Sequence, residues 1–287
     1  MVAGCMRALA IAALFVTGCG SGEPAPAPTP APAAAPARIV SLSPSATEVV
    51  AALGAVPQLV GVDTYSKFPA EVAAVAKVGD YLHPNAEIIL QMRPTLVIAD
   101  DVHVDIAHVL TDAHVHVASC PIHTLVDVKA CLGQVGRALG RTDVAAAVTA
   151  KIDADVAAAR AAAPASHPRV LLVLDRDPAG LGNLVAAGPG SYVDELLAVV
   201  GGANVLAASA LPYPKVSLED ILRARPEVIL DLSFAARDGT TAWDALDVPA
   251  AHAHRVLAIS DETLTAPSPR VGQALGTLLH ALALPVK

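Results

Sequence analysis

Three of the four tyrosines of this chain, Tyr65, Tyr81 and Tyr213, stand in short segments rich in proline, serine or aspartate. A tyrosine ring has an apolar face and a hydroxyl that forms hydrogen bonds, so it suits contact with a large flat ligand. Packing of the surrounding turn is the alternative role. We predict that these three tyrosines contact a ligand. Tyr192 follows residues 188–190 (GPG) and starts a helix, and for it we favour the packing role.

Ten histidines raise the question of a metal site. Five of them lie between residues 103 and 123, but the elements predicted there spread them over a loop, a helix, a strand and a turn. We therefore predict no metal site and a surface position for most of them. His83 and His103 lie near the predicted ligand cleft, where an imidazole could ligate haem iron or cobalt.

Motifs of common enzymes are absent from the sequence: there is no GxSxG elbow, no GxxxxGK[ST] loop and no HExxH pair. Asp175 and Asp177 flank Arg176, but two acids near a strand end do not by themselves make an acid–base pair. We predict that the protein is not an enzyme and needs no cofactor.

The elements that must position these residues alternate between strand and helix. Short β-branched runs predict strands at residues 38–42, 58–63, 95–100 and 115–120, with helices at 46–53 and 85–92 between them. Ser45 precedes the first helix, and Glu48 follows it at the spacing of a capping box. This alternation predicts a mostly parallel sheet, with the ligand at the carboxyl ends of the strands. Amide groups at the start of the helix after Ser45 would face the same cleft.

The second half of the chain repeats the alternation. Strands are predicted at residues 169–174, 227–232 and 255–260, with helices from residue 192 and over 270–284. Between the halves, residues 125–163 are rich in alanine, the best helix former, and Gly140 interrupts them. The fold class is therefore α/β, with two Rossmann-like lobes, at residues 38–140 and 165–287, joined by a single long helix at 141–164.

Composition restricts the range of partners. The 287 residues are 54% hydrophobic, which excludes a wholly disordered chain, and the formal net charge of −8 lacks the basic footprint that a nucleic-acid backbone requires. We predict no nucleic-acid partner. Two of the four cysteines, Cys120 and Cys131, lie in the predicted folded region, and they either form a disulfide or remain two small buried thiols.

The first 37 residues are predicted to lie outside the fold. Arg7 precedes an uncharged apolar run at 8–16, too short to span a bilayer but typical of the core of a signal peptide. Residues 16–19 (VTGC) resemble a bacterial lipobox, which implies cleavage after residue 18 and lipid attachment to Cys19. The Pro/Ala-rich residues 19–37 then form a tether. We expect an exported protein, periplasmic or on the outer face of the cytoplasmic membrane, anchored through Cys19.

Longer motifs carry a resemblance over about residues 38–284. They are RIVSLSPSATEVVAALG, LVGVDTYSKFP and VGDYLHPNAEIILQMRPTLVIAD in the first half, and GPGSYVDELLAVVGGANV, LPYPKVSLEDILRARPEVIL and APSPRVGQALGTLLHAL in the second. Their order and spacing resemble the helical-backbone class of ABC-transporter substrate-binding proteins, which serve importers of cobalamin, haem and ferric siderophores. The details are most similar to the cobalamin binders.

The resemblance implies roles for particular residues. Ligand contacts fall on Ser45, Tyr65, Tyr81, His83, Tyr213 and Arg270. An aromatic residue of the cobalamin binders is replaced by Asp100. Glu87 in PNAEIIL and Glu219 in VSLEDIL match glutamates that pair with arginines of the permease, although first-turn acids that only complement helix dipoles are the alternative.

The sequence therefore predicts a vitamin-transport binding protein that takes up a small-molecule ligand, most simply a corrinoid, and delivers it to the transmembrane permease of an ABC importer. Haem or a ferric siderophore is the first alternative. Haem binders usually have tyrosine directly after the Val-Gly of this motif and arginine two residues later, whereas here Asp80, Tyr81, Leu82 and His83 follow Gly79. Siderophore binders often place basic residues in the cleft, for which Arg176 and Arg270 are candidates. A zinc-binding or adhesin-like surface lipoprotein is the second alternative.

Overall fold

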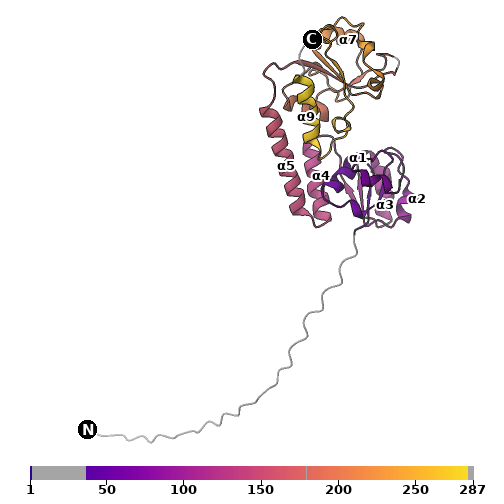
Figure 1. The fold of residues 1–287 in the computed structure, drawn as a ribbon. Helices are drawn as coiled ribbons and strands as arrows, with labels where there is room; N and C mark the ends of the chain where they lie inside the picture. The colour runs from indigo at the N-terminus through magenta and orange to yellow at the C-terminus, as the bar shows by residue number, and fades with distance from the viewer. Residues whose placement is uncertain (2–36, 179, 284–287) are drawn as a thin grey trace. The chain divides into compact units, whose positions relative to one another are not determined.

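The computed structural model describes residues 1, 37–178 and 180–283, which contain two α/β halves with one sheet each (Figure 1). The first sheet has the order β2-β1-β3-β4, and all of its strand pairs are parallel. Its strands are β1 (Ile39–Ser41), β2 (Leu59–Val62), β3 (Leu96–Ala99) and β4 (Val117–Ser119). All four strands lie within the predicted segments, and β1 and β3 are buried throughout.

The second sheet has the order β6-β5-β8-β9, with β7 also paired to β5. Its strands are β5 (Arg169–Asp175), β6 (Val185–Ala186), β7 (Ala203–Asn204), β8 (Val228–Asp231) and β9 (Val256–Ala258). Only β6 runs antiparallel to its neighbour in this described sheet. The predicted α/β class with two mainly parallel sheets is confirmed.

Helices cover the sheets and connect the strands. They are α1 (Pro44–Ala52), α2 (Ala86–Gln91), α3 (Val104–Asp112), α4 (Leu125–Ala138), α5 (Thr142–Ala161), α6 (Tyr192–Val199), α7 (Leu218–Ala224), α8 (Pro249–His252) and α9 (Val271–Ala283). Short 3-10 helices occupy Val56–Gln58, Ala70–Ala74, Asp101–His103, Phe234–Asp238, Thr241–Trp243 and Glu262–Leu264.

The first helix begins two residues earlier than predicted. Ser43, not Ser45, is its N-cap, and the Ser43 side chain accepts a hydrogen bond from the amide of Ala46. Pro44 occupies the first helical position, where its missing amide hydrogen has no cost. The predicted cap at Ser45 is therefore wrong, and Glu48 is free to interact elsewhere.

The alanine-rich stretch folds as two helices in sequence, α4 and α5. Gly140, with φ of +64°, breaks the stretch where the sequence predicts, and α5 occupies most of residues 141–164. Helix α5 packs against both α4 and α9, as Figure 1 shows. Two halves joined by a packed helix have little freedom for a large hinge motion.

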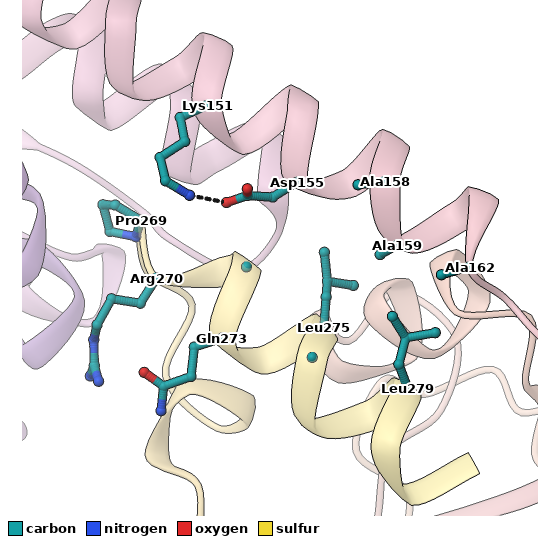
Figure 2. Close-up of a pocket in the computed structure, with 12 residues that line it drawn as sticks. Lys151, Asp155, Ala158, Ala159, Ala162, Pro269, Arg270, Gln273, Leu275 and Leu279 are labelled. Carbon is teal, nitrogen blue, oxygen red and sulfur yellow. Dashed lines mark hydrogen bonds and ion pairs between the residues drawn. The ribbon is translucent and has the colours of Figure 1, made fainter. Parts of the chain in front are cut away.

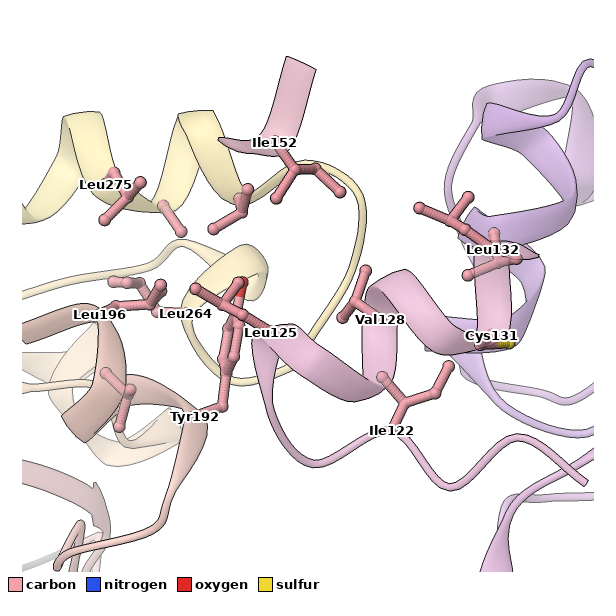
Figure 3. Close-up of a cluster of buried hydrophobic side chains, with 14 of the residues drawn as sticks. Ile122, Leu125, Val128, Cys131, Leu132, Ile152, Tyr192, Leu196, Leu264 and Leu275 are labelled. Carbon is pink, nitrogen blue, oxygen red and sulfur yellow. The ribbon is translucent and has the colours of Figure 1, made fainter. Parts of the chain in front are cut away.

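One hydrophobic cluster extends from the first half through the helices to the second (Figure 3). Tyr192 lies in this cluster, 2% exposed, near Leu125, Leu196 and Leu264. It packs in the core, in agreement with the role favoured for it.

Cys120 and Cys131 close a short loop at the edge of the same cluster. They form a disulfide with their Cα atoms 5.3 Å apart. The sequence allowed this pairing but did not decide it.

The predictions for the amino terminus fall outside the described residues. These are the signal peptide at 1–18, the lipidated Cys19 and nearly all of the tether at 19–37. Within the part of the chain that the structure describes, no helix is both long and apolar enough to cross a bilayer.

Candidate ligand-binding site

A cavity of about 720 Å³ lies at the carboxyl ends of the strands of the first sheet. Residues 43–45, 65, 80–83, 100 and 122–123 line it from the first half, and residues 213 and 265–267 from the second. The predicted position, at the carboxyl edge of a parallel sheet and between the two halves, matches where ligands bind in open α/β folds.

The three predicted tyrosines reach this one cavity from different loops. Tyr65 is 59% exposed, Tyr213 is 51% exposed, and Tyr81 is half-buried. Leu82, also on the wall, is largely exposed. Open apolar surface of this kind is ready to be covered by a ligand.

Close backbone contacts hold the loops that carry the tyrosines. Thr64 donates to the carbonyl of Gly79 from both its amide (2.9 Å) and its hydroxyl (2.8 Å), which joins the Tyr65 loop to the Tyr81 loop. Gly79 has φ of +121°, and a Cβ there would lie 2.3 Å from the carbonyl oxygen of His83. Glycine is therefore required at this position.

The loop of Tyr213 is held against the second sheet in the same way. The amides of Ala186 and Gly188 donate to the carbonyls of Pro214 (3.0 Å) and Pro212 (2.8 Å). A Cβ on Gly188 would lie 2.3 Å from the carbonyl oxygen of Leu211, so only glycine allows this approach.

Asp100 anchors the half-buried Tyr81. The Tyr81 hydroxyl donates to Oδ2 of Asp100 at 3.0 Å. Burial, together with the neighbouring Asp100 carboxylate, raises the pKa of Tyr81 well above its usual range, so this hydroxyl remains a donor at neutral pH.

His103 supports the same loop from inside the protein. Its Nδ1 accepts from the amide of Asp100 at 2.9 Å, so its Nε2 carries the proton and donates to the carbonyl of Tyr81 at 2.6 Å. Both ring nitrogens are engaged, and His103 is buried. The suggestion that His103 ligates iron or cobalt is therefore wrong, and the residue is structural.

His83 is exposed on the wall of the cavity. Oδ1 of Asp80 accepts from the amides of Leu82 and His83 at 2.8 Å each and lies 3.1 Å from Nδ1 of His83. These hydrogen bonds, the one from the His83 amide first, hold the pKa of Asp80 below its usual range. Asp80 thus presents a negative charge at the rim.

A second acid–imidazole pair lies beside Asp100. Nε2 of His123 is 2.9 Å from Oδ2 of Asp101. This contact raises the pKa of His123 and lowers that of Asp101. Among the described residues, Asp100, Asp101 and His123 are the one group of three possible metal ligands that lie close together. The group contains a single histidine.

The other histidines between residues 103 and 123 lie outside this group of three. His108, His114 and His116 are exposed. His114 has φ of +63°, and both His114 and His116 precede β4, so they do not form a pair on one face of that strand.

No arginine or lysine lines the cavity within residues 37–178 and 180–283. Arg176 is buried in the second half, where its Nε is 2.7 Å from Oδ2 of Asp231. Its suggested role in holding an anionic chelate is therefore wrong.

Arg270 also lies outside the cavity lining. It borders a groove between α5 and α9, and Figure 2 shows its side chain pointing away from α5. Its Nε donates to Oε2 of Glu48 at 2.8 Å and its Nη2 donates to Oε1. The structure thus brings Ser45, Tyr65, Tyr81, His83 and Tyr213 together, but not Arg270.

Glu87 and Glu219 are both exposed and lie in the first turns of α2 and α7. Neither lines the cavity, and each has an exposed apolar neighbour in sequence, Ile88 and Leu218. Their docking role stays a prediction.

Sequence reasoning placed Asp100 in a loop at the carboxyl edge of the first sheet, directly after β3, but noted only that it replaces an aromatic residue and gave it no role. It missed the acidic character of the wall, because Asp80 and Asp100 lie 20 positions apart in the sequence and meet on one cavity only through the fold.

Comparison with known proteins places this geometry in a family. The model of the periplasmic binding protein family matches residues 39–240, and the chain belongs to that family. The vitamin B12-binding protein of Vibrio cholerae serotype O1 is 27% identical over 244 residues, which cover 83% of this chain and 86% of that protein. The predicted membership in the class that includes cobalamin and haem binders is confirmed.

Two solved structures share the fold over nearly their whole length. The periplasmic heme-binding protein RhuT from Roseiflexus sp. RS-1, in apo form, has a TM-score of 0.77 and 30% identity, covering 86% of this chain and 98% of that one. The periplasmic vitamin B12 binding protein BtuF of Vibrio cholerae has a TM-score of 0.74 and 26% identity, covering 86% and 97%. Similar proteins therefore include both corrinoid and haem binders.

Proposed function

We propose that this protein captures a corrinoid in the cavity between its two halves and delivers it to the permease of an ABC importer. It binds and releases the ligand unchanged and is not an enzyme. A lipid on Cys19 holds it at the membrane, as the resemblance of residues 16–19 to a lipobox suggests. Glu87 and Glu219 dock it on the permease.

The observation that carries the choice of ligand is the charge of the cavity wall. Tyrosines supply apolar faces and hydroxyls, Asp80 and Asp100 supply carboxylates, and no described arginine or lysine lines the wall. Corrinoids carry amide side chains around the ring, which suit neutral and anionic hydrogen-bond acceptors. Haem carries two propionates, and anionic ferric chelates are similar in charge, so both favour arginine or lysine on the wall. The imidazoles that line the cavity, His83 and His123, already lie beside the carboxylates of Asp80 and Asp101.

Haem remains the second candidate because of one residue. His83 is exposed on the wall, and no hydrogen bond reaches its Nε2 from the described residues, so that nitrogen could ligate iron. The similarity to a heme-binding protein also favours this alternative. The carboxylates of the wall oppose it.

Truncation of the tyrosines tests the site. Tyr65→Ala, Tyr81→Ala and Tyr213→Ala should each weaken cyanocobalamin binding by about 1–3 kcal/mol, the range for removing the buried apolar surface of a large side chain. Tyr65→Ala and Tyr213→Ala should leave thermal stability nearly unchanged, since more than half of each residue is already exposed. Titration calorimetry measures the affinities.

Phe234→Ala is the matched control. Phe234 is an exposed aromatic residue of the second half that does not line the cavity, so its removal should leave affinity unchanged. Three tyrosine variants that bind as tightly as the parent would show that the ligand lies elsewhere.

A further inference from the structure

Asp100 is a buried carboxylate on the wall of the cavity. It directly follows β3 and is 7% exposed. The amide of Asp101 donates to its Oδ1 at 2.8 Å, and the Tyr81 hydroxyl donates to its Oδ2 at 3.0 Å. In the described part of the chain no arginine, lysine or histidine forms an ion pair with it.

A buried charge without a counter-ion opposes folding. Burial raises the pKa of Asp100, so its folded-state pKa lies above that of an unfolded aspartate. The stability associated with this group therefore decreases as pH rises through the folded pKa. A neutral residue of the same shape would be better for stability alone.

The residues around the Asp100 carboxylate indicate a role for its charge in ligand binding. It is fixed in place by Tyr81, one of the three tyrosines on the wall, and Asp80 supplies a second carboxylate to the same wall. His123 also lines the cavity, and its Nε2 is 2.9 Å from Oδ2 of Asp101, so a charge on this imidazole is balanced by Asp101. A ligand that enters between the tyrosines therefore meets the Asp100 carboxylate, which has no ion pair of its own among the described residues.

We propose that Asp100 determines charge specificity: it orients Tyr81 through the hydroxyl and excludes ligands that carry a carboxylate beside the ring. This inference rests on the proposed corrinoid function and extends it, because it predicts selection among corrinoids by charge. A neutral amide side chain can donate to Asp100, whereas a carboxylate at the same place repels it.

The experiment compares cyanocobalamin with its monocarboxylic acids, made by hydrolysis of one propionamide and used as separate isomers. Each is titrated calorimetrically into the parent protein, Asp100→Asn and Tyr81→Phe at neutral pH. The parent should prefer cyanocobalamin over at least one isomer by about tenfold or more. Asp100→Asn should reduce this preference to about threefold or less, because the amide keeps the contact with Tyr81 but has no charge.

Two controls separate charge from shape. Tyr81→Phe should weaken the binding of neutral and acidic corrinoids by the same factor, so the preference for cyanocobalamin should remain. Asp105→Asn, an exposed acid of α3 outside the cavity lining, should change neither affinity nor preference. Thermal unfolding should show that Asp100→Asn is at least as stable as the parent at neutral pH. Asp100→Ser is a second variant that replaces the carboxylate with an uncharged hydrogen-bond acceptor.

The results that would overturn the proposal are distinct from failure of the proposed function. Equal binding of all isomers by the parent, or a preference that survives in both Asp100 variants, would contradict the role of Asp100 while leaving corrinoid binding intact. A parent protein that binds neither cyanocobalamin nor its acids would contradict the corrinoid function and this inference together.

Discussion

Replacing Arg270 with alanine is expected to lower the free energy of unfolding by about 3 kcal/mol, the cost of leaving a buried charge without its partner. The guanidinium donates two hydrogen bonds to the carboxylate of Glu48, which is 6% exposed, and its central carbon lies 3.9 Å from the centre of the Phe68 ring. Arg270 precedes α9 in the second half, whereas Glu48 and Phe68 belong to the first. The contact thus joins the two halves beside the cavity.

Denaturant unfolding of the parent and variant measures the effect. Arg223→Ala is the matched control, since Arg223 forms an exposed ion pair with Asp220 and should cost less than about 1 kcal/mol. Adding Glu48→Gln to Arg270→Ala should recover part of the stability, because it removes the uncompensated charge. An Arg270→Ala variant no less stable than Arg223→Ala would show that this contact does not hold the halves together.

Reversing both docking acids is expected to reduce uptake by about tenfold or more while sparing ligand affinity. Glu87 and Glu219 lie on different halves, and neither lines the cavity. Charge pairs at two separate points control orientation and encounter with a partner more than they control ligand binding. Exposed apolar side chains accompany them, Ile88 on α2 and Leu218 with Leu222 on α7, as an interface would require.

The measurement is the uptake of labelled cyanocobalamin by cells of the source organism, in which the Glu87→Arg/Glu219→Arg variant replaces the parent protein. A single reversal should have a smaller effect, because one contact remains. The matched control is Glu71→Arg with Asp244→Arg, which makes the same change of charge at one exposed acid in each half, outside α2 and α7. Cells with this control variant should take up cyanocobalamin at the parent rate. If the acids only complement helix dipoles, the double variant should be destabilised by about 0.3–1 kcal/mol per site and still transport at the parent rate.

The positions of most strands and helices could be predicted because their signals are local. β-branched runs mark β1, β3 and β5, and Gly140 marks the break between α4 and α5. The cap of α1 was also within reach of the sequence, since a serine followed by proline is typical of a helix start. The two-residue strands β6 and β7 have no local signal and depend on pairing with β5.

Site residues could be predicted only where a position in a loop at the carboxyl edge of a sheet was itself the signal. This signal predicts Tyr65, Tyr81 and Tyr213. The pairing of Arg270 with Glu48 joins residues 222 positions apart, so no local pattern predicts it. The engagement of both nitrogens of His103 depends in the same way on two backbone groups, one of them in the loop of Tyr81.

The central claim, a corrinoid ligand in an acidic tyrosine-lined cavity, is tested most directly by parallel titrations of the purified protein with cyanocobalamin and with haem. Titration calorimetry with visible absorption should show saturable binding of one cyanocobalamin per chain, and much weaker binding of haem, which places propionates against Asp80 and Asp100. Tight one-to-one binding of haem, with no heat from cyanocobalamin, would contradict the account.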